Sequence, residues 1–296
     1  MIRRLLPLLL LAFLLSACGG QPAASSSQSA PVILTSTPWL ADVTRSIAGD
    51  RLQVESLLPD GSDPHSYQPT PQDAARMSES KLIIVNGAGY EQFLKSLLEN
   101  GGSGTMVVEA STGVSASEEA GSVDPHMWLD PNNMIVYTEN IRDALIHLDP
   151  QGEATYQSNA DSYIAQLKTL DTWIRQQVGK IPEEKRLLIT NHESLGYFAK
   201  RYGFRLAGSV IKSFSSDASP SAQQLAALID QVRSSGAPAI FLDAADSDTF
   251  ARQIAQETGV KVVTDLHLES LTDGPPAGTY IDMMKNNVTQ IVNALK

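Results

Sequence analysis

Residues 150–180 read PQGEATYQSNADSYIAQLKTLDTWIRQQVGK, and this stretch decides how the chain is organised. Its apolar side chains recur at intervals of three and four residues, which is typical of an amphipathic helix. The residues on this predicted face are Tyr163, Ile164, Leu167, Leu170, Ile174 and Val178. A helix of about 28 residues is roughly 42 Å long. We therefore expect it to run along two parts of the protein and to join them stiffly.

Short apolar runs alternate with helical patterns on both sides of this helix. Before it, strands are predicted at 32–34, 52–54, 82–85 and 106–108, with helices near 39–49, 71–79 and 90–99. After it, strands at 187–189, 239–242 and 260–263 alternate with helices at 193–202, 248–258 and 278–295. Strands that alternate with helices indicate parallel βαβ units.

The sequence therefore predicts an α/β protein with two lobes, each a mainly parallel sheet with flanking helices, joined by one long rigid helix. We expect the N-terminal lobe at 31–148, the linking helix at 149–180 and the C-terminal lobe at 181–296. Residues 110–123 are expected to form a solvated loop.

The N-terminus has the pattern of an export signal. Arg3 and Arg4 precede an apolar run at 5–15, which is too short to stay in a bilayer as a spanning helix. The LSAC stretch that follows resembles a bacterial lipobox, and its Cys18 is the single cysteine of the chain. We expect residues 1–17 to be a cleaved signal peptide, Cys18 to be lipidated, and residues 18–30 to form a flexible tether. The protein would then be exported and lipid-anchored on the extracytoplasmic face of the membrane, in the periplasm or at the cell surface.

Composition excludes one class of partner. The chain has 296 residues, 42% of them hydrophobic and 19% charged, as in a soluble globular protein. Its formal net charge of −11 argues against nucleic acid, because binding to phosphates needs a basic face. We expect a monomer that binds no nucleic acid.

Three of the five histidines occupy similar places in the predicted fold. His65 and His126 each end an Asp-Pro-His motif, and His192 directly follows the run at 187–191. All three lie at or beyond the C-terminal end of a strand, where open α/β sheets place their ligands. Proline restricts the backbone before each of the first two imidazoles, and an aspartate two residues away could accept a hydrogen bond from the ring. The pattern predicts a metal site.

A closed tetrahedral site needs a fourth ligand. The segment at 264–271 reads TDLHLESL, so Asp265, His267 and Glu269 are all candidates. Their spacing alone does not choose among them. His147, on a helical pattern, is interpreted as a surface residue.

From about residue 34 to residue 296, the chain resembles the metal-specific solute-binding proteins of bacterial ABC transporters, of the zinc/manganese type. Four ordered motifs carry the resemblance: LLPDGSDPHSYQPTP at 57–71, DPHMWLDP at 124–131, NHESLGYFAKRYG at 191–203 and GTYIDMMKNNV at 278–288. In the family, an aspartate in an Asp-Ser-Leu run precedes the last motif by a fixed step. Here that run is Glu269-Ser270-Leu271.

The resemblance implies the metal ligands His65, His126, His192 and Glu269, with Asp265 as the reserve candidate for the fourth. Three imidazoles and one carboxylate suit Zn²⁺, with Mn²⁺ as the alternative. Family members tuned to manganese tend to carry an acidic residue where this chain has His192, although some members with three histidines are linked to manganese. The resemblance also implies delivery of the metal to an ABC permease. The chain carries no phosphate-binding loop motif, so we expect no ATP hydrolysis and no enzyme.

Two alternatives belong to other classes. One is a zinc-dependent hydrolase that uses the three histidines with water in the fourth position and Glu193 as general base. The other is an adhesin-like surface lipoprotein, which the resemblance permits. Closure of the site by Glu269 discriminates against the hydrolase.

Overall fold

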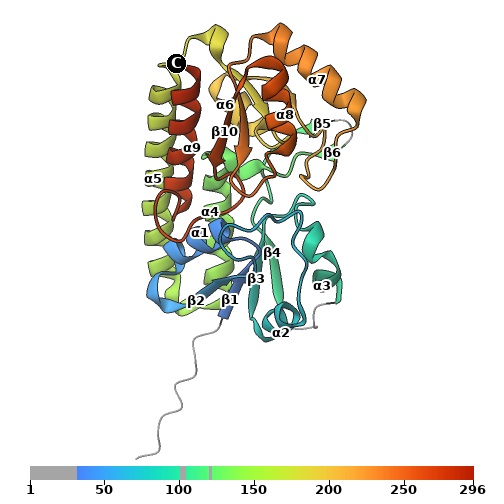
Figure 1. The fold of residues 1–296 in the computed structure, drawn as a ribbon. Coiled ribbons are helices and arrows are strands. Elements are labelled where there is room, and N and C mark those ends of the chain that lie inside the picture. The colour runs from blue at the N-terminus through green and yellow to red at the C-terminus, as the bar shows by residue number, and fades with distance from the viewer. Residues whose placement is uncertain (1–31, 101–104, 120–121) are drawn as a thin grey trace, which may run out of the picture. The chain divides into compact units, whose positions relative to one another are not determined.

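The computed structural model describes residues 32–100, 105–119 and 122–296. The predicted signal peptide, Cys18 and the tether lie outside these residues. Residues Pro31–Lys296 form one compact unit, in which two parallel sheets flanked by helices lie along a long helix (Figure 1). The predicted fold class is therefore confirmed, whereas the lobe boundaries at 148, 149, 180 and 181 stay a prediction.

The N-terminal lobe is built on a four-stranded sheet of order β2-β1-β3-β4, in which all pairs are parallel. Its strands are β1 Val32–Thr35, β2 Gln53–Ser56, β3 Leu82–Val85 and β4 Met106–Glu109. Its helices are α1 Pro38–Ala48, α2 Pro71–Glu79 and α3 Lys95–Asn100. Both α1 and α2 begin with a threonine cap followed by proline, and Thr70 forms a capping box with Asp73. This box fixes where the segment that carries His65 ends.

The C-terminal lobe repeats the plan with a sheet of order β10-β9-β7-β8, again with all pairs parallel. Its strands are β7 Leu187–Thr190, β8 Arg205–Ser209, β9 Ala239–Asp243 and β10 Lys261–Leu266. Its helices are α6 Gly196–Tyr202, α7 Ala222–Ser235, α8 Thr249–Thr258 and α9 Tyr280–Leu295. The central strands β7 and β9 are buried throughout, which explains why they read as unbroken apolar runs.

The long helix is α5, Glu153–Val178, and it packs against α1, α4 (Asn133–Leu148) and α9. In Figure 1, α5 and α9 lie side by side, and α5 runs along both lobes. One continuous cluster of buried side chains contains Ile33 of the first sheet, Leu167 of α5 and Leu188 of the second sheet. The two lobes therefore share a hydrophobic core.

Several local details differ from the sequence-based prediction. Residues near 90–99 begin as a short 3-10 turn before α3, and Ile164 on the predicted apolar face of α5 is only half-buried. The expected loop at 110–123 contains the antiparallel hairpin of β5 (Glu118–Glu119) and β6 (Ser122–Val123). The short 3-10 turns are Gly49–Arg51, Gln92–Leu94, Met127–Leu129, Pro150–Gly152 and Glu183–Lys185. Within the described residues, no helix combines the length and the apolarity needed to cross a membrane.

Candidate metal centre

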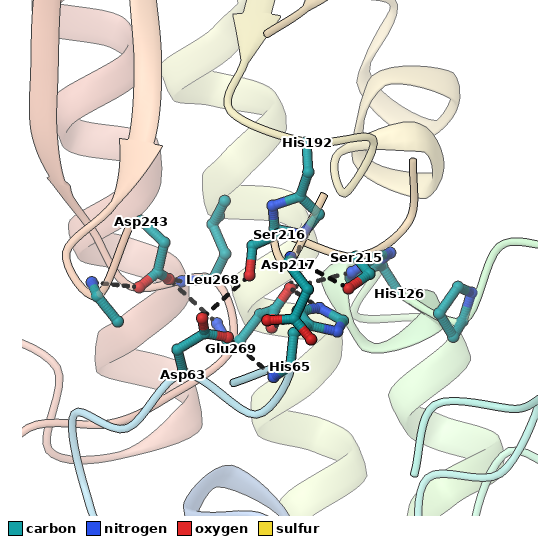
Figure 2. A network of polar contacts seen from close by, with 12 residues as sticks. Asp63, His65, His126, His192, Ser215, Ser216, Asp217, Asp243, Leu268 and Glu269 are labelled. Atoms are coloured by element: carbon teal, nitrogen blue, oxygen red, sulfur yellow. Dashed lines mark hydrogen bonds and ion pairs between the residues drawn. The ribbon is translucent and has the colours of Figure 1, made fainter. Parts of the chain in front are cut away.

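The four side chains proposed as ligands come together from loops of both lobes. His65 lies between β2 and α2, His126 precedes a 3-10 turn, His192 follows β7, and Glu269 follows β10. Figure 2 shows the four side chains converging on one point. Each offers one donor atom, and the four atoms lie within 4.8 Å of one another.

The distances suit a four-coordinate ion. Glu269 Oε1 lies 3.3 Å from His65 Nε2, 3.1 Å from His126 Nε2 and 2.8 Å from His192 Nε2. A tetrahedron whose bonds are about 2.0–2.2 Å long has edges of about 3.4 Å. The three distances from Glu269 Oε1 are close to this edge length, and all three imidazoles present the same nitrogen, Nε2, to the carboxylate.

Burial differs among the four side chains. The exposed fraction is 10% for the His65 side chain, 0% for His126, 2% for His192 and 5% for Glu269. A buried carboxylate must be paired or must coordinate a cation. The three imidazoles pair with the Glu269 carboxylate in the metal-free site. A bound metal ion would satisfy the same requirement.

The pKa values of His126 and Glu269 are each shifted by the charged groups around them. Burial alone would lower the pKa of His126, but its hydrogen bonds to Asp124 and Glu269 outweigh burial and raise that pKa to about 9. Burial opposes ionisation of Glu269, yet the charges of His65 and His192 bring its pKa well below the ordinary value. In the metal-free protein the ionised carboxylate of Glu269 therefore faces the protonated imidazole of His126.

Asp124 holds the ring of His126 on the side that faces away from the other ligands. Asp124 Oδ1 lies 2.9 Å from His126 Nδ1, so Asp124 accepts the ring N–H and leaves Nε2 to face the other ligands. The expected hydrogen bond from aspartate to ring is thus present in the second Asp-Pro-His motif. It is absent from the described contacts of the first, where Asp63 accepts instead from the backbone of His65 and from Ser216.

The segment that carries Glu269 is fixed by Trp128 of the second motif and by Asp243, a residue that the sequence patterns did not single out. Asp243, at the end of β9, accepts hydrogen bonds from the backbone N–H groups of Leu268 and Glu269. Trp128 Nε1 donates to the carbonyl of Leu268 across 2.8 Å. Burial raises the pKa of Asp243 to about 7. The position of Asp243 at the C-terminal end of a buried strand was the signal that could have revealed it.

The other candidate ligands lie outside the cluster. Strand β10 extends through Asp265, and the side chain of Asp265 is exposed. His267 is half-buried, and its backbone N–H donates to Asn287. Glu193, the proposed base of a hydrolase, is half-buried, and its carboxylate accepts from Ser209. The structure therefore brings Glu269 to the three histidines and leaves Asp265 apart.

Fold and site together define a class: a two-lobed binding protein with a cation site between its lobes. Comparison with known proteins gives the family. The family described as "ZnuA: Zinc-uptake complex component A periplasmic" matches residues 33–294, and the chain belongs to this family.

Relatives cover almost the whole chain. The manganese-binding lipoprotein MntA of Halalkalibacterium halodurans is 35% identical over 292 residues, which are 97% of this chain and 96% of that protein. A Mn-bound periplasmic metal-binding protein from Candidatus Liberibacter asiaticus matches with a TM-score of 0.80 and 32% identity, covering 90% of this chain and 100% of that one. The periplasmic zinc-binding protein TroA of Treponema pallidum matches with a TM-score of 0.84 and 26% identity, covering 90% and 99%.

These findings confirm the predicted class of metal solute-binding proteins of bacterial ABC transporters. The protein works on the extracytoplasmic face of the membrane and binds a metal ion. Members of this class are solute-binding proteins, so the prediction that the chain is no enzyme is also confirmed, and neither the hydrolase nor the adhesin alternative is favoured.

Proposed function

We propose that this protein captures a divalent transition metal, with zinc preferred, and delivers it to the permease of an ABC transporter for uptake. The proposed ligands are His65, His126, His192 and Glu269. The observation that carries the proposal is that four donor atoms from both lobes lie within 4.8 Å of one another.

Zinc is proposed as the preferred cargo because of the donor set. Three imidazole nitrogens and one carboxylate oxygen suit four-coordinate Zn²⁺, whereas Mn²⁺ favours sites richer in oxygen. The general affinity order of divalent metals also places zinc above manganese. Manganese is the alternative cargo, since several relatives are named for manganese and three of the similar structures hold manganese.

Binding is proposed to depend on the position of the lobes, because each lobe supplies two ligands. The shared core along α5 limits how far the lobes can separate. We therefore expect a small shift of one lobe against the other when metal binds, not a wide hinge opening.

Attachment to the membrane is proposed through Cys18, with the protein acting as a monomer. Mass spectrometry of protein extracted from bacterial membranes tests this attachment. A mature chain that begins with a lipidated Cys18 supports it, and an unmodified N-terminus contradicts it.

Elemental analysis of the protein purified without added metal tests the central proposal, followed by competition between zinc and manganese. We expect bound zinc and a rise in melting temperature on adding it, because a ligand held only by the native state stabilises that state. A preparation that retains neither metal and is stabilised by neither contradicts metal capture. Displacement of zinc by equimolar manganese contradicts only the preference for zinc.

A further inference from the structure

His65 is the outermost of the four proposed ligands. Its side chain is 10% exposed, compared with 0% for His126 and 2% for His192. Among the described residues, a cavity of about 550 Å³ is lined by His65 with Tyr90 and Phe214, and by none of the other three ligands. His65 is thus the ligand that borders this cavity.

The segment that carries His65 is tied to the opposite lobe. Residues 57–70 connect β2 to α2 through turns. The backbone N–H of Gly61 donates to the carbonyl of Leu271 across 3.0 Å and lies 2.7 Å from Ser270 Oγ. Both acceptors belong to the C-terminal lobe. The position of His65 therefore depends on contacts that cross between the lobes.

Apart from the contact of the His65 ring with Glu269, the crossing contact nearest to His65 in the sequence is made by Asp63. One carboxylate oxygen, Oδ1, accepts from the backbone N–H of His65 across 2.9 Å. The other, Oδ2, accepts from the hydroxyl of Ser216 in the C-terminal lobe across 3.0 Å. Figure 2 shows Asp63 between the two partners. One charged side chain thus joins a metal ligand of one lobe to the surface of the other.

We infer that Asp63 is a positioning residue that controls release of the metal, an inference that rests on the proposed function. When the lobes separate, the bond between Asp63 and Ser216 breaks. His65 then loses its support from the C-terminal lobe before the other ligands lose their supports. His126 keeps its bond to Asp124, Glu269 keeps its bond to Asp243, and the backbone of His192 keeps the bond that Thr190 donates to its carbonyl, each within one lobe. His65 is then the first ligand to leave, and the ion departs through the cavity beside it.

The chemistry supports this division of roles. The bond from Asp63 to the His65 backbone is a local turn, and the same turn exists at Asp124 and His126. What distinguishes Asp63 is its second oxygen, which is bound 153 residues away along the chain. Hydrogen bonds to a charged acceptor are stronger than those between neutral groups. Ser216 therefore holds Asp63, and through it His65, only while the lobes are closed.

Release of zinc from the intact protein into excess chelator, followed by stopped flow, tests the inference. Ser216→Ala removes the crossing bond and leaves the turn at His65. We expect it to release zinc about tenfold faster than the wild type, with an association rate within twofold of the wild-type value. Asp63→Ala should accelerate release at least as much, and adding Ser216→Ala to it should change little, because both remove the same contact.

Two further variants separate positioning from a general disturbance of structure. Asp63→Asn keeps an oxygen for the His65 N–H and offers an amide N–H to Ser216, so it should restore most of the slow release. Ser215→Ala is the matched control, because Ser215 lines the same cavity but its hydroxyl accepts only a bond from Asp217 within its own loop among the described contacts.

The outcomes are distinct. Equal acceleration by Ser215→Ala and Ser216→Ala, or wild-type release from Ser216→Ala, overturns the role of Asp63. Failure of Asp63→Asn to slow release relative to Asp63→Ala overturns it as well. If the wild type itself binds neither zinc nor manganese, the proposed function fails, whereas bound metal with unchanged release in the variants removes this inference alone.

Discussion

The two Asp-Pro-His motifs share three residues and one backbone turn, yet they hold their imidazoles in different ways. Asp124 accepts from the ring of His126, which is completely buried. Asp63 makes no such bond among the described contacts, and its second oxygen binds Ser216 of the other lobe. The imidazole of His126 is fixed from within its own lobe, whereas that of His65 depends on lobe closure.

The surroundings of the two aspartates cause this difference. Asp124 is buried beside Gly196, where a Cβ atom would lie 2.6 Å from its Oδ2. Asp63 is half-buried at the rim of the site. A binding protein must hold its ion firmly and also release it. One motif serves the first requirement, and the other can serve the second.

Removing each imidazole should have the largest effect. Structural zinc sites with four ligands contribute about 10–16 kcal/mol, so the loss of one ligand costs about 3 kcal/mol, or more than a hundredfold in affinity. We expect His126→Ala to exceed this loss and His65→Ala to stay near it, because His126→Ala also removes the ring partner of the buried Asp124, whereas Glu269 keeps its remaining imidazoles in either variant. Chelator competition measures both affinities. A greater loss in His65→Ala would break the comparison.

Asp124→Ala should weaken zinc binding by about 10–100-fold, the usual effect of removing the partner that orients a ligating histidine. Asp63→Ala should weaken affinity by about tenfold, the lower end of that range, entirely through faster release, because Asp63 does not touch the ring. Isothermal titration under competition with a chelator measures both affinities. Similar losses in the two variants would show that the motifs are equivalent.

Acidity should act chiefly through His126. Its pKa of about 9 in the folded, metal-free protein means that zinc must displace a proton at neutral pH. Zinc affinity should therefore rise between pH 6.5 and about 9, by up to about tenfold per pH unit for one displaced proton.

The free energy of unfolding of the metal-free protein should change in the opposite direction and fall as pH rises. Because the folded pKa of His126 lies above its ordinary value of 6.5, the stabilisation is complete below pH 6.5 and is lost as pH rises through about 9. Zinc titrations and thermal melts over this range test both trends. Asp124→Ala should move the upper end of this pH range to lower pH. An unchanged upper end would contradict Asp124 as the partner that raises the pKa of His126.

The smallest effects are expected from substitutions of two glycines. In Gly196→Ala the new methyl group meets Asp124, and overpacking of this kind costs about 1–3 kcal/mol in the free energy of unfolding. Zinc affinity should also fall a few-fold, since Asp124 is displaced from the His126 ring. Gly61→Ala is the matched control near His65, where space is open but a φ of +72° strains alanine by about 1 kcal/mol. Urea unfolding and zinc titration should separate the two variants, and equal losses of zinc affinity would contradict the difference.

Much of the fold could be predicted from the sequence because its strands are buried and read as continuous apolar runs. Helix α7 was missed although Ser221 and Gln224 form a readable capping box at its start. The choice between Asp265 and Glu269 depended on where β10 ends, and strand ends are the least certain part of such a reading. The resemblance to a family, and not the spacing, led to Glu269.

The difference between the two motifs could not be predicted at all. Asp-Pro-His is the same local sequence at both sites, and what separates them is contact with residues far along the chain. Gly196 leaves room for Asp124, and Ser216 reaches Asp63 from the other lobe. No periodicity or motif at either site specifies these partners.

The shared core of the two lobes also determines how the molecule unfolds. Side chains of α1 and α4 pack on α5, and α9 from the end of the chain packs on the same helix. A fragment that stopped after α4 would expose this apolar surface to water and invite aggregation. We therefore expect a single cooperative transition for the whole protein. Zinc, although it would contact only four side chains, should then raise the melting temperature of both lobes together.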